Sequence, residues 1–223
     1  MTSPLSRRTL LTGLTAVVPV LLTGCSSNSK SDSKKAAKAA NATAARASDP
    51  GGDAFVMIIR HGEKPDGSTP GLDENGKHDS KSLTERGWSR AKALPKLFDP
   101  PATGLRKPAR IYAASDQGPL AGAHRMRQTV TPLGAALGLK VDITYAESQE
   151  TELAGAVLTG AQPVLISWEH GRIPRIVEAL GATGSGAPAV WPDRFDLVWV
   201  FSRTAGGPWT FQEVHQHLLD GDS

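Results

Sequence analysis

The chain has 223 residues, of which 39% are hydrophobic and 21% are charged, and its formal net charge at pH 7 is +3. The basic excess is local, because seven of the 25 basic residues but only one of the 22 acidic residues precede Asp49. From Asp49 onward the chain has 18 basic and 21 acidic side chains. This mildly acidic remainder argues against general nucleic-acid binding, which needs a positive face. Residues 53–223 suffice for one domain with its own core, and they are too few for two ordinary domains.

Residues 1–25 have the pattern of a bacterial signal peptide. Arg7 and Arg8 precede an apolar run that ends at Leu22 and is short for a membrane span. The arginine pair suggests twin-arginine export, although Leu10 stands where that motif more often has phenylalanine, so Sec export stays open. Residues 22–25, Leu-Thr-Gly-Cys, resemble a lipobox, in which the cysteine is acylated. We therefore expect Cys25, the only cysteine in the chain, to anchor an exported lipoprotein to the cell membrane.

Residues 26–52 consist mainly of Ser, Ala, Lys and Asn, with almost nothing apolar larger than alanine. Such a segment cannot bury enough surface to offset the entropy lost on ordering. We expect a flexible low-complexity tether, with an Ala/Lys helix over 34–47 as the structural alternative.

Strand-like and helix-like patterns alternate from residue 53 onward. Apolar runs predict strands over 54–60, 109–114, 139–145 and 164–168, and helices are expected from 85 to about 95 and over 123–137, 150–158 and 173–180. Ser82 and Glu85 have the spacing of a capping box for the first helix. Residues 196–202 and 209–214 predict an antiparallel hairpin at one sheet edge. The expected fold is therefore α/β, with three αβα layers and a mostly parallel central sheet.

The tetrapeptide Arg60-His61-Gly62-Glu63 directly follows the apolar run 55–59. Open α/β sheets bind their ligands at the carboxyl ends of the strands, so the histidine and the arginine stand where chemistry is usually found. Gly62 permits a tight exit from the strand, which lets the His61 ring face a cleft. The pattern indicates a phosphate-handling centre.

Four segments together resemble the histidine phosphatase superfamily, the phosphoglycerate-mutase-like enzymes. They are residues 60–63, residues 83–87 with Ala91, residues 125–129, and residues 164–171, which contain a second His-Gly pair. Their order and spacing agree with the family over roughly residues 53 to 203. The resemblance implies a phosphoglycerate-mutase-like fold and a phosphatase or mutase that needs no metal or other cofactor.

The resemblance also implies a role for each matching residue. His61 would be the nucleophile, with one ring nitrogen attacking phosphorus while the other donates to a backbone carbonyl. An imidazole suits this task because it is substantially neutral near pH 7 and its phosphoramidate is labile to water. Arg60 and Arg125 would bind the equatorial oxygens with their paired donors, and His170 would complete the cradle.

Several further residues are candidates for the same cleft. We favour Arg125 over Arg127 because Arg125 stands three residues before Gln128, as in the family pattern R-x-x-Q-T. Gly62, Glu63 and Ser115 are expected to contact the substrate, and His124 is a weaker candidate for the same role.

The proton donor to the leaving group is not settled by the sequence, because four carboxyl groups can approach the cleft: Glu63, Glu147, Glu150 and Glu169. Glu147 is favoured, since it follows the third strand, where the mutase-like branch usually places its acid. The flanking residues 146–150 match that branch poorly. Glu169 is a departure, because the family more often has a small residue just before its second histidine.

A phosphatase is favoured over a mutase for two reasons. In the mutase pattern a Ser and a nearby Asn follow the first motif, whereas Lys64-Pro65-Asp66 follows it here. An exported lipoprotein would also not meet the cytosolic sugar-phosphate pool. We therefore expect hydrolysis of a small phosphomonoester outside the cytoplasm. The alternative is a lipoprotein that binds an anion in the same cleft without turnover. The sequence does not indicate the physiological substrate or the oligomeric state.

A metal site is not predicted. His215 and His217 are two residues apart and would share one face of a strand, but no third ligand with suitable spacing accompanies them.

Overall fold

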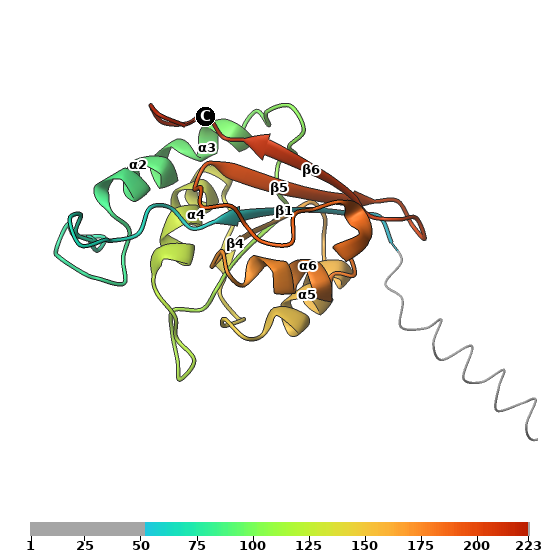
Figure 1. Ribbon diagram of the computed structural model, residues 1–223, viewed down its shortest axis with the longest axis horizontal. Coiled ribbons are helices and arrows are strands. Elements are labelled where there is room, and N and C mark those ends of the chain that lie inside the picture. The colour runs from blue at the N-terminus through green and yellow to red at the C-terminus, as the bar shows by residue number, and fades with distance from the viewer. Residues whose placement is uncertain (1–51, 223) are drawn as a thin grey trace, which may run out of the picture. The chain divides into compact units, whose positions relative to one another are not determined.

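Six strands form one mixed sheet in the order β3-β2-β4-β1-β5-β6 (Figure 1). The computed structural model describes residues 52–222, so the expectations for the signal peptide 1–25, for Cys25 and for nearly all of the tether 26–52 lie outside the described residues. The strands are β1 Ala54–Arg60, β2 Arg110–Ala113, β3 Val141–Asp142, β4 Val164–Trp168, β5 Leu197–Arg203 and β6 Thr210–His215.

The direction of the strands confirms the predicted fold class. β1 pairs parallel with β4, β4 pairs parallel with β2, and β2 pairs parallel with β3. β5 runs antiparallel to β1, and β6 runs antiparallel to β5, so the predicted hairpin occupies one sheet edge. Because β1, β2 and β4 are parallel neighbours, their carboxyl ends meet at the same side of the sheet.

Helices flank the sheet, as expected. They are α2 Glu85–Ala93, α3 Pro95–Phe98, α4 Arg125–Leu137, α5 Glu150–Thr159 and α6 Ile173–Ala179, with a short 3₁₀ turn at Thr183–Ser185. Helix α4 packs against α2 and α3, and α5 packs against α6. Gly138 ends α4 in the left-handed conformation, which glycine adopts without steric cost. None of the helices within residues 52–222 is long and apolar enough to cross a membrane.

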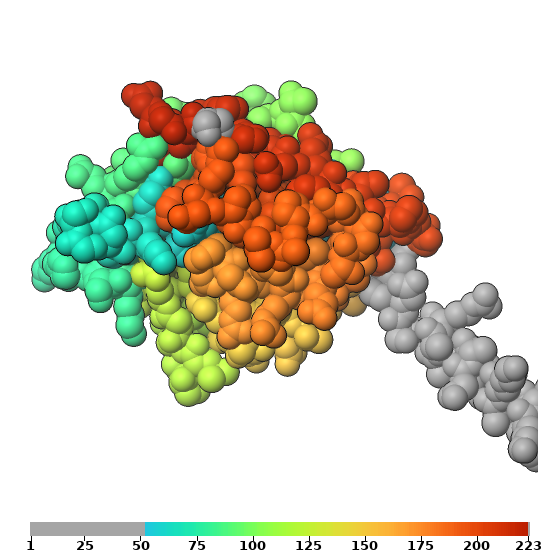
Figure 2. Space-filling view, in the orientation of Figure 1, coloured from blue at the N-terminus to red at the C-terminus, as the bar shows by residue number. Residues whose placement is uncertain are grey.

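The core lies between the sheet and its helices. Six of the seven residues of β1 are buried, as is every residue of β4, which explains why both strands have continuous apolar runs. In contrast, the loop between β2 and α4 projects from the body of the molecule, where it is drawn in yellow-green at the bottom of the view (Figure 2).

Two local predictions were wrong. The third strand, expected over 139–145, contains only Val141 and Asp142. Its first residue, Leu139, instead donates its N–H to Gly134 O at the end of α4, and the Asp142 side chain accepts from Thr144 N, which turns the chain away from the sheet.

The cap of α2 also differs from the prediction. Thr84, and not Ser82, caps this helix, because its hydroxyl accepts from Gly87 N. The Ser82 hydroxyl donates to Asp79 instead. Thr84 directly precedes Glu85, so the spacing from Ser82 to Glu85 does not form a capping box here.

Candidate active site

The side chain of His61 is almost completely buried at the carboxyl end of β1, with 1% of its surface exposed. Its Nδ1 lies 2.7 Å from the backbone oxygen of Gly62. A carbonyl oxygen can only accept, so Nδ1 carries the ring proton and Nε2 presents a lone pair. No residue within 52–222 forms a hydrogen bond with Nε2. This is the tautomer that the family resemblance implies for a nucleophile.

The protonation of His61 is set mainly by its burial, which lowers its pKa to about 3. The positive charges of Arg125, Arg60 and His170 act in the same direction, while the contact with the Gly62 carbonyl opposes them. These three groups come from α4, from β1 and from the loop after β4, so the structure brings together the cations that the sequence placed around His61. The ring is neutral at physiological pH.

The backbone around His61 is held from two neighbouring elements. His61 N donates to Trp168 O of β4, and Gly62 N donates to the hydroxyl of Thr129 in α4. A methyl group on Gly62 would lie 3.1 Å from the backbone oxygen of Gly87 in α2. A side chain at this position would therefore require α2 to move by a few tenths of an ångström. Its N–H is already paired with Thr129, so the predicted substrate contact through Gly62 has no support in this geometry.

Arg60 is held by a loop that the sequence did not single out. Its guanidinium is 2% exposed, stacks 3.8 Å above the ring of Phe195, and donates from Nη1 to the carboxylate of Asp193 at 3.0 Å. The Phe195 ring also lies 6.1 Å from the His61 ring. The buried Nε–H of Arg60 has no hydrogen-bond partner. A stacked guanidinium with a spare inward donor is suited to binding an anion.

Arg125 and Arg127 have different surroundings. Arg125 donates once, from Nη1 to Ser80 O at 3.2 Å, and its buried Nε–H has no hydrogen-bond partner. Arg127 donates to Asp116 at 2.7 Å and to Glu74 at 3.0 Å, so two carboxylates compensate its charge. The geometry favours Arg125 as the anion-binding arginine, in agreement with the R-x-x-Q-T pattern. Gln128 and Thr129 of that pattern hold the backbone of Leu83 and Gly62, respectively.

His170 lies two residues after β4, the strand next to β1. Its Nδ1 is 2.6 Å from the carboxylate of Glu169, and its side chain is about one-third exposed (33%). Burial and the charge of Arg60 lower its pKa, whereas Glu169 raises it. Glu169, the departure from the family pattern, is thus the carboxylate beside the second histidine.

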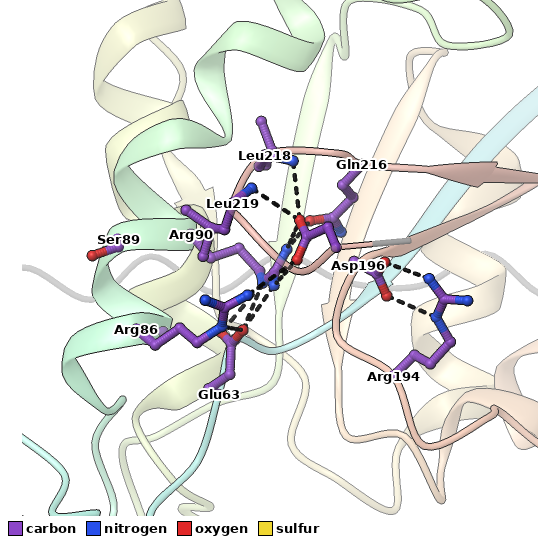
Figure 3. A network of polar contacts seen from close by, with 12 residues as sticks. Glu63, Arg86, Ser89, Arg90, Arg194, Asp196, Gln216, Leu218 and Leu219 are labelled. Carbon is purple, nitrogen blue, oxygen red and sulfur yellow. Dashed lines mark hydrogen bonds and ion pairs between the residues drawn. The ribbon is translucent and has the colours of Figure 1, made fainter.

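Glu63 does not join this group. Its carboxylate accepts from Arg86 at 3.2 Å and from Arg90 at 2.7 Å (Figure 3). Arg90 also binds Asp222 near the C-terminal end. The side chains of Arg90 and Asp222 are each only 3% exposed. The predicted contact of Glu63 with substrate, and its candidacy as the proton donor, are therefore not supported. Its carboxylate is part of a buried ion-pair network instead.

The remaining carboxyl groups also differ. Glu150 is buried, and its Oε1 accepts from Ser148 N and from Trp168 Nε1. Glu147 forms no hydrogen bond or ion pair with any residue in 52–222. Burial, followed by the negative charge of Glu169, raises the pKa of Glu147, and the charge of Arg125 acts on it as well. Among the four candidates, Glu147 alone combines a free carboxyl group with a raised pKa and proximity to Arg125.

Ser115, His124, His215 and His217 have local partners. The Ser115 hydroxyl donates to Gln117 O and accepts from Gln117 N, so its predicted substrate contact has no support. His124 pairs with Asp116 at 2.9 Å. The rings of His215 and His217 stack, with 5.7 Å between their centroids.

Within the described part of the chain, no group of three or more His, Cys, Asp or Glu side chains is arranged to hold a metal ion.

No protein-family model matches the sequence, and no curated protein matches it. Three solved structures resemble the chain. A candidate phosphohistidine phosphatase SixA from Nakamurella multipartitia is 19% identical with a TM-score of 0.46, and the match covers 75% of this chain and 98% of that one. A protein histidine phosphatase SixA complexed with tungstate is 16% identical with a TM-score of 0.49, covering 73% and 97%.

A phosphoserine phosphatase from Entamoeba histolytica, in complex with 3-phosphoglyceric acid, is 14% identical with a TM-score of 0.46, and the match covers 74% of this chain and 100% of that one. At these identities the likeness concerns the fold. These three structures are described as phosphohistidine, protein histidine and phosphoserine phosphatases, respectively.

Proposed function

We propose that this protein is a phosphomonoester phosphatase that works through a phosphohistidine on His61. The observation that carries the proposal is the state of one ring: His61 is neutral, its proton is fixed on Nδ1, and its Nε2 is free. Arg60 and Arg125 each keep a buried Nε–H without a partner beside it. A free nucleophile flanked by unused cationic donors is suited to phosphoryl transfer, where catalysis rests on positioning and on charge.

The reaction would have two steps. In the first, Nε2 of His61 forms a bond to phosphorus while the ester P–O bond breaks, and the proton of Glu147 goes to the leaving oxygen. In the second, water attacks phosphorus, gives its proton to Glu147, and the P–N bond breaks. This releases inorganic phosphate and returns the neutral ring with its proton still on Nδ1.

The charges around the ring support both steps. Arg60, Arg125 and His170 would compensate the charge that spreads over the three equatorial oxygens. Burial and the charge of Glu169 raise the pKa of Glu147, which favours the protonated state that a proton donor needs.

The location and the substrate class of the proposal rest on sequence. The signal-like residues 1–25 and the lipobox at Cys25 support action outside the cytoplasm by a lipid-anchored protein, on a small phosphorylated substrate and without a metal or other cofactor. Replacing Cys25 with Ser should release the protein from the membrane fraction without loss of phosphatase activity, and retention in that fraction would contradict the lipid anchor.

The test is hydrolysis of p-nitrophenyl phosphate by the full-length protein with EDTA present. We expect turnover by the wild type, a loss on the order of 10³-fold or more in His61→Ala, and wild-type activity in His78→Ala, which replaces an exposed histidine outside the site. Equal activity in the wild type and His61→Ala would contradict the nucleophile. Phosphate binding without any turnover would favour the alternative, a lipoprotein that only binds an anion.

A further inference from the structure

The residue after Glu147 has an uncommon backbone conformation. Ser148 has a φ of 87°, and His217 is the only other residue apart from glycine with positive φ in the described part of the chain. Residues other than glycine rarely adopt a positive φ. They keep this conformation only where the surrounding structure imposes it. Ser148 is exposed and its hydroxyl has no hydrogen bond, so nothing in its own side chain explains the conformation.

The surroundings of Ser148 do impose it. Glu150, which is 5% exposed, accepts Ser148 N at 3.1 Å and Trp168 Nε1 at 3.2 Å with the same oxygen. Trp168 is the last residue of β4 and is fully buried. The Gln149 side chain accepts from Ala146 N at 2.9 Å, which closes the other side of the turn. The turn is therefore tied to the sheet through one buried carboxylate.

We propose that Glu150 is a positioning residue: by holding Ser148 in its left-handed conformation, it directs the carboxyl group of Glu147 toward the leaving-group oxygen. This inference rests on the proposed phosphatase function and on Glu147 as its proton donor. Glu147 has no hydrogen bond or ion pair of its own within residues 52–222, and its carboxyl group lies beside the backbone of Gly122, so the backbone of this turn decides where its side chain begins. A proton donor displaced by about 1 Å from its productive position loses much of its effect.

The dependence on the leaving group separates positioning from general stability. Hydrolysis of p-nitrophenyl phosphate needs little protonation, because its leaving group is a stable anion. Hydrolysis of an alkyl phosphate such as glycerol 2-phosphate depends on the acid. Loss of Glu147, or a change in the direction of its carboxyl group, should therefore lower the hydrolysis of glycerol 2-phosphate more than that of p-nitrophenyl phosphate. A variant that merely unfolds part of the protein lowers both equally.

Substitutions at Ser148 test the turn without disturbing the core, because this residue is exposed. Ser148→Val introduces a β-branched side chain that disfavours positive φ, and we expect its alkyl-to-aryl activity ratio to fall about tenfold. Ser148→Gly accepts the conformation and should keep the ratio within about twofold. Thr144→Val is the matched control, since it adds the same side chain at an exposed residue that lacks positive φ.

Substitutions at Glu150 test the carboxylate itself. Glu150→Ala removes the acceptor and should lower the ratio at least as much as Ser148→Val. Glu150→Gln keeps an oxygen at the same place and should restore most of the ratio. Equal losses with both substrates in Ser148→Val, or a wild-type ratio in Glu150→Ala, would overturn the positioning role.

Glu147→Gln separates this inference from the function on which it rests. The alkyl-to-aryl activity ratio of Glu147→Gln should fall by about 100-fold or more, which is the usual contribution of a general acid. If Glu147→Gln leaves the ratio unchanged, the proton donor is wrong and the positioning role fails with it. If the wild type hydrolyses neither substrate, the phosphatase itself is wrong.

Discussion

The hydroxyl of Thr129 accepts a hydrogen bond from the backbone N–H of Gly62 at 2.8 Å and donates one to the backbone oxygen of Arg125 at 2.7 Å. One side chain thus joins the segment that carries His61, the proposed nucleophile, to the helix that carries Arg125, the proposed anion-binding residue. This link therefore holds the backbone after His61 against the start of α4.

Thr129→Val should therefore weaken both the fold and the activity. The substitution keeps the shape but leaves the buried Gly62 N–H unpaired, which costs about 1–3 kcal/mol of unfolding free energy. Thr129→Ser keeps the hydroxyl and is the control. Urea unfolding followed by fluorescence measures the loss, and an unfolding midpoint of Thr129→Val equal to that of Thr129→Ser would show that the hydrogen bond contributes nothing.

The two arginines of α4 should differ in their contribution to catalysis. Arg125→Ala removes a guanidinium with an unused buried donor, and we expect kcat/KM for p-nitrophenyl phosphate to fall by about 10²–10³. Arg127→Ala breaks ion pairs with Asp116 and Glu74 and should cost less than about tenfold. Similar losses in the two variants would mean that the site was assigned to the wrong arginine or to neither.

The decline of phosphatase activity at high pH should depend on Glu169. Its negative charge raises the pKa of Glu147 and that of His170, and both groups act in their protonated forms. Activity toward an alkyl phosphate therefore declines as the pH rises through these pKa values. Glu169→Gln removes the charge, lowers both pKa values, and should move the decline to lower pH.

The control for this shift is Glu178→Gln, which removes one negative charge from an exposed residue of α6. Its profile of kcat/KM against pH should match that of the wild type. A decline in Glu169→Gln at the wild-type pH, or at a higher pH, is the result that the electrostatic account does not permit.

Asp193 should oppose substrate binding. Its side chain is 96% exposed, yet it accepts a hydrogen bond from Arg60, and this bond lowers its pKa. A phosphate group must share that guanidinium with the carboxylate. Asp193→Ala should therefore lower the inhibition constant of inorganic phosphate by a few fold at low salt. Glu152→Ala, on the exposed face of α5, is expected to leave it unchanged, and an unchanged constant in Asp193→Ala would show that the two anions do not compete.

The sequence predicted the parts of the site that follow buried strands. His61, His170 and the start of α4 could be placed because apolar runs mark β1 and β4, and parallel strands end at the same side of a sheet. The sequence could not predict that Arg90 binds both Glu63 and Asp222, because Arg90 and Asp222 are 132 positions apart in the chain and meet only after folding. The sequence also did not indicate the loop that contains Asp193 and Phe195, because no periodic pattern marks it.

Two local errors have a simpler cause. Ser82 and Thr84 are both suitable helix caps, and the choice between them depends on the Gln128 side chain, which donates to the Ser82 hydroxyl. The third strand was too long in the prediction because its apolar residues Ile143 and Tyr145 pack against the core without pairing in the sheet.

The most direct test of the central claim is to trap the phosphorylated protein. The full-length protein is mixed with ³²P-labelled substrate and quenched within milliseconds in alkali, where a phosphoramidate survives, and a parallel sample is quenched in acid, where it hydrolyses. We predict label on the peptide that contains His61, stable in alkali, lost in acid and missing in His61→Ala. Rapid turnover with no labelled protein at any time, or with label retained by His61→Ala, would contradict the account.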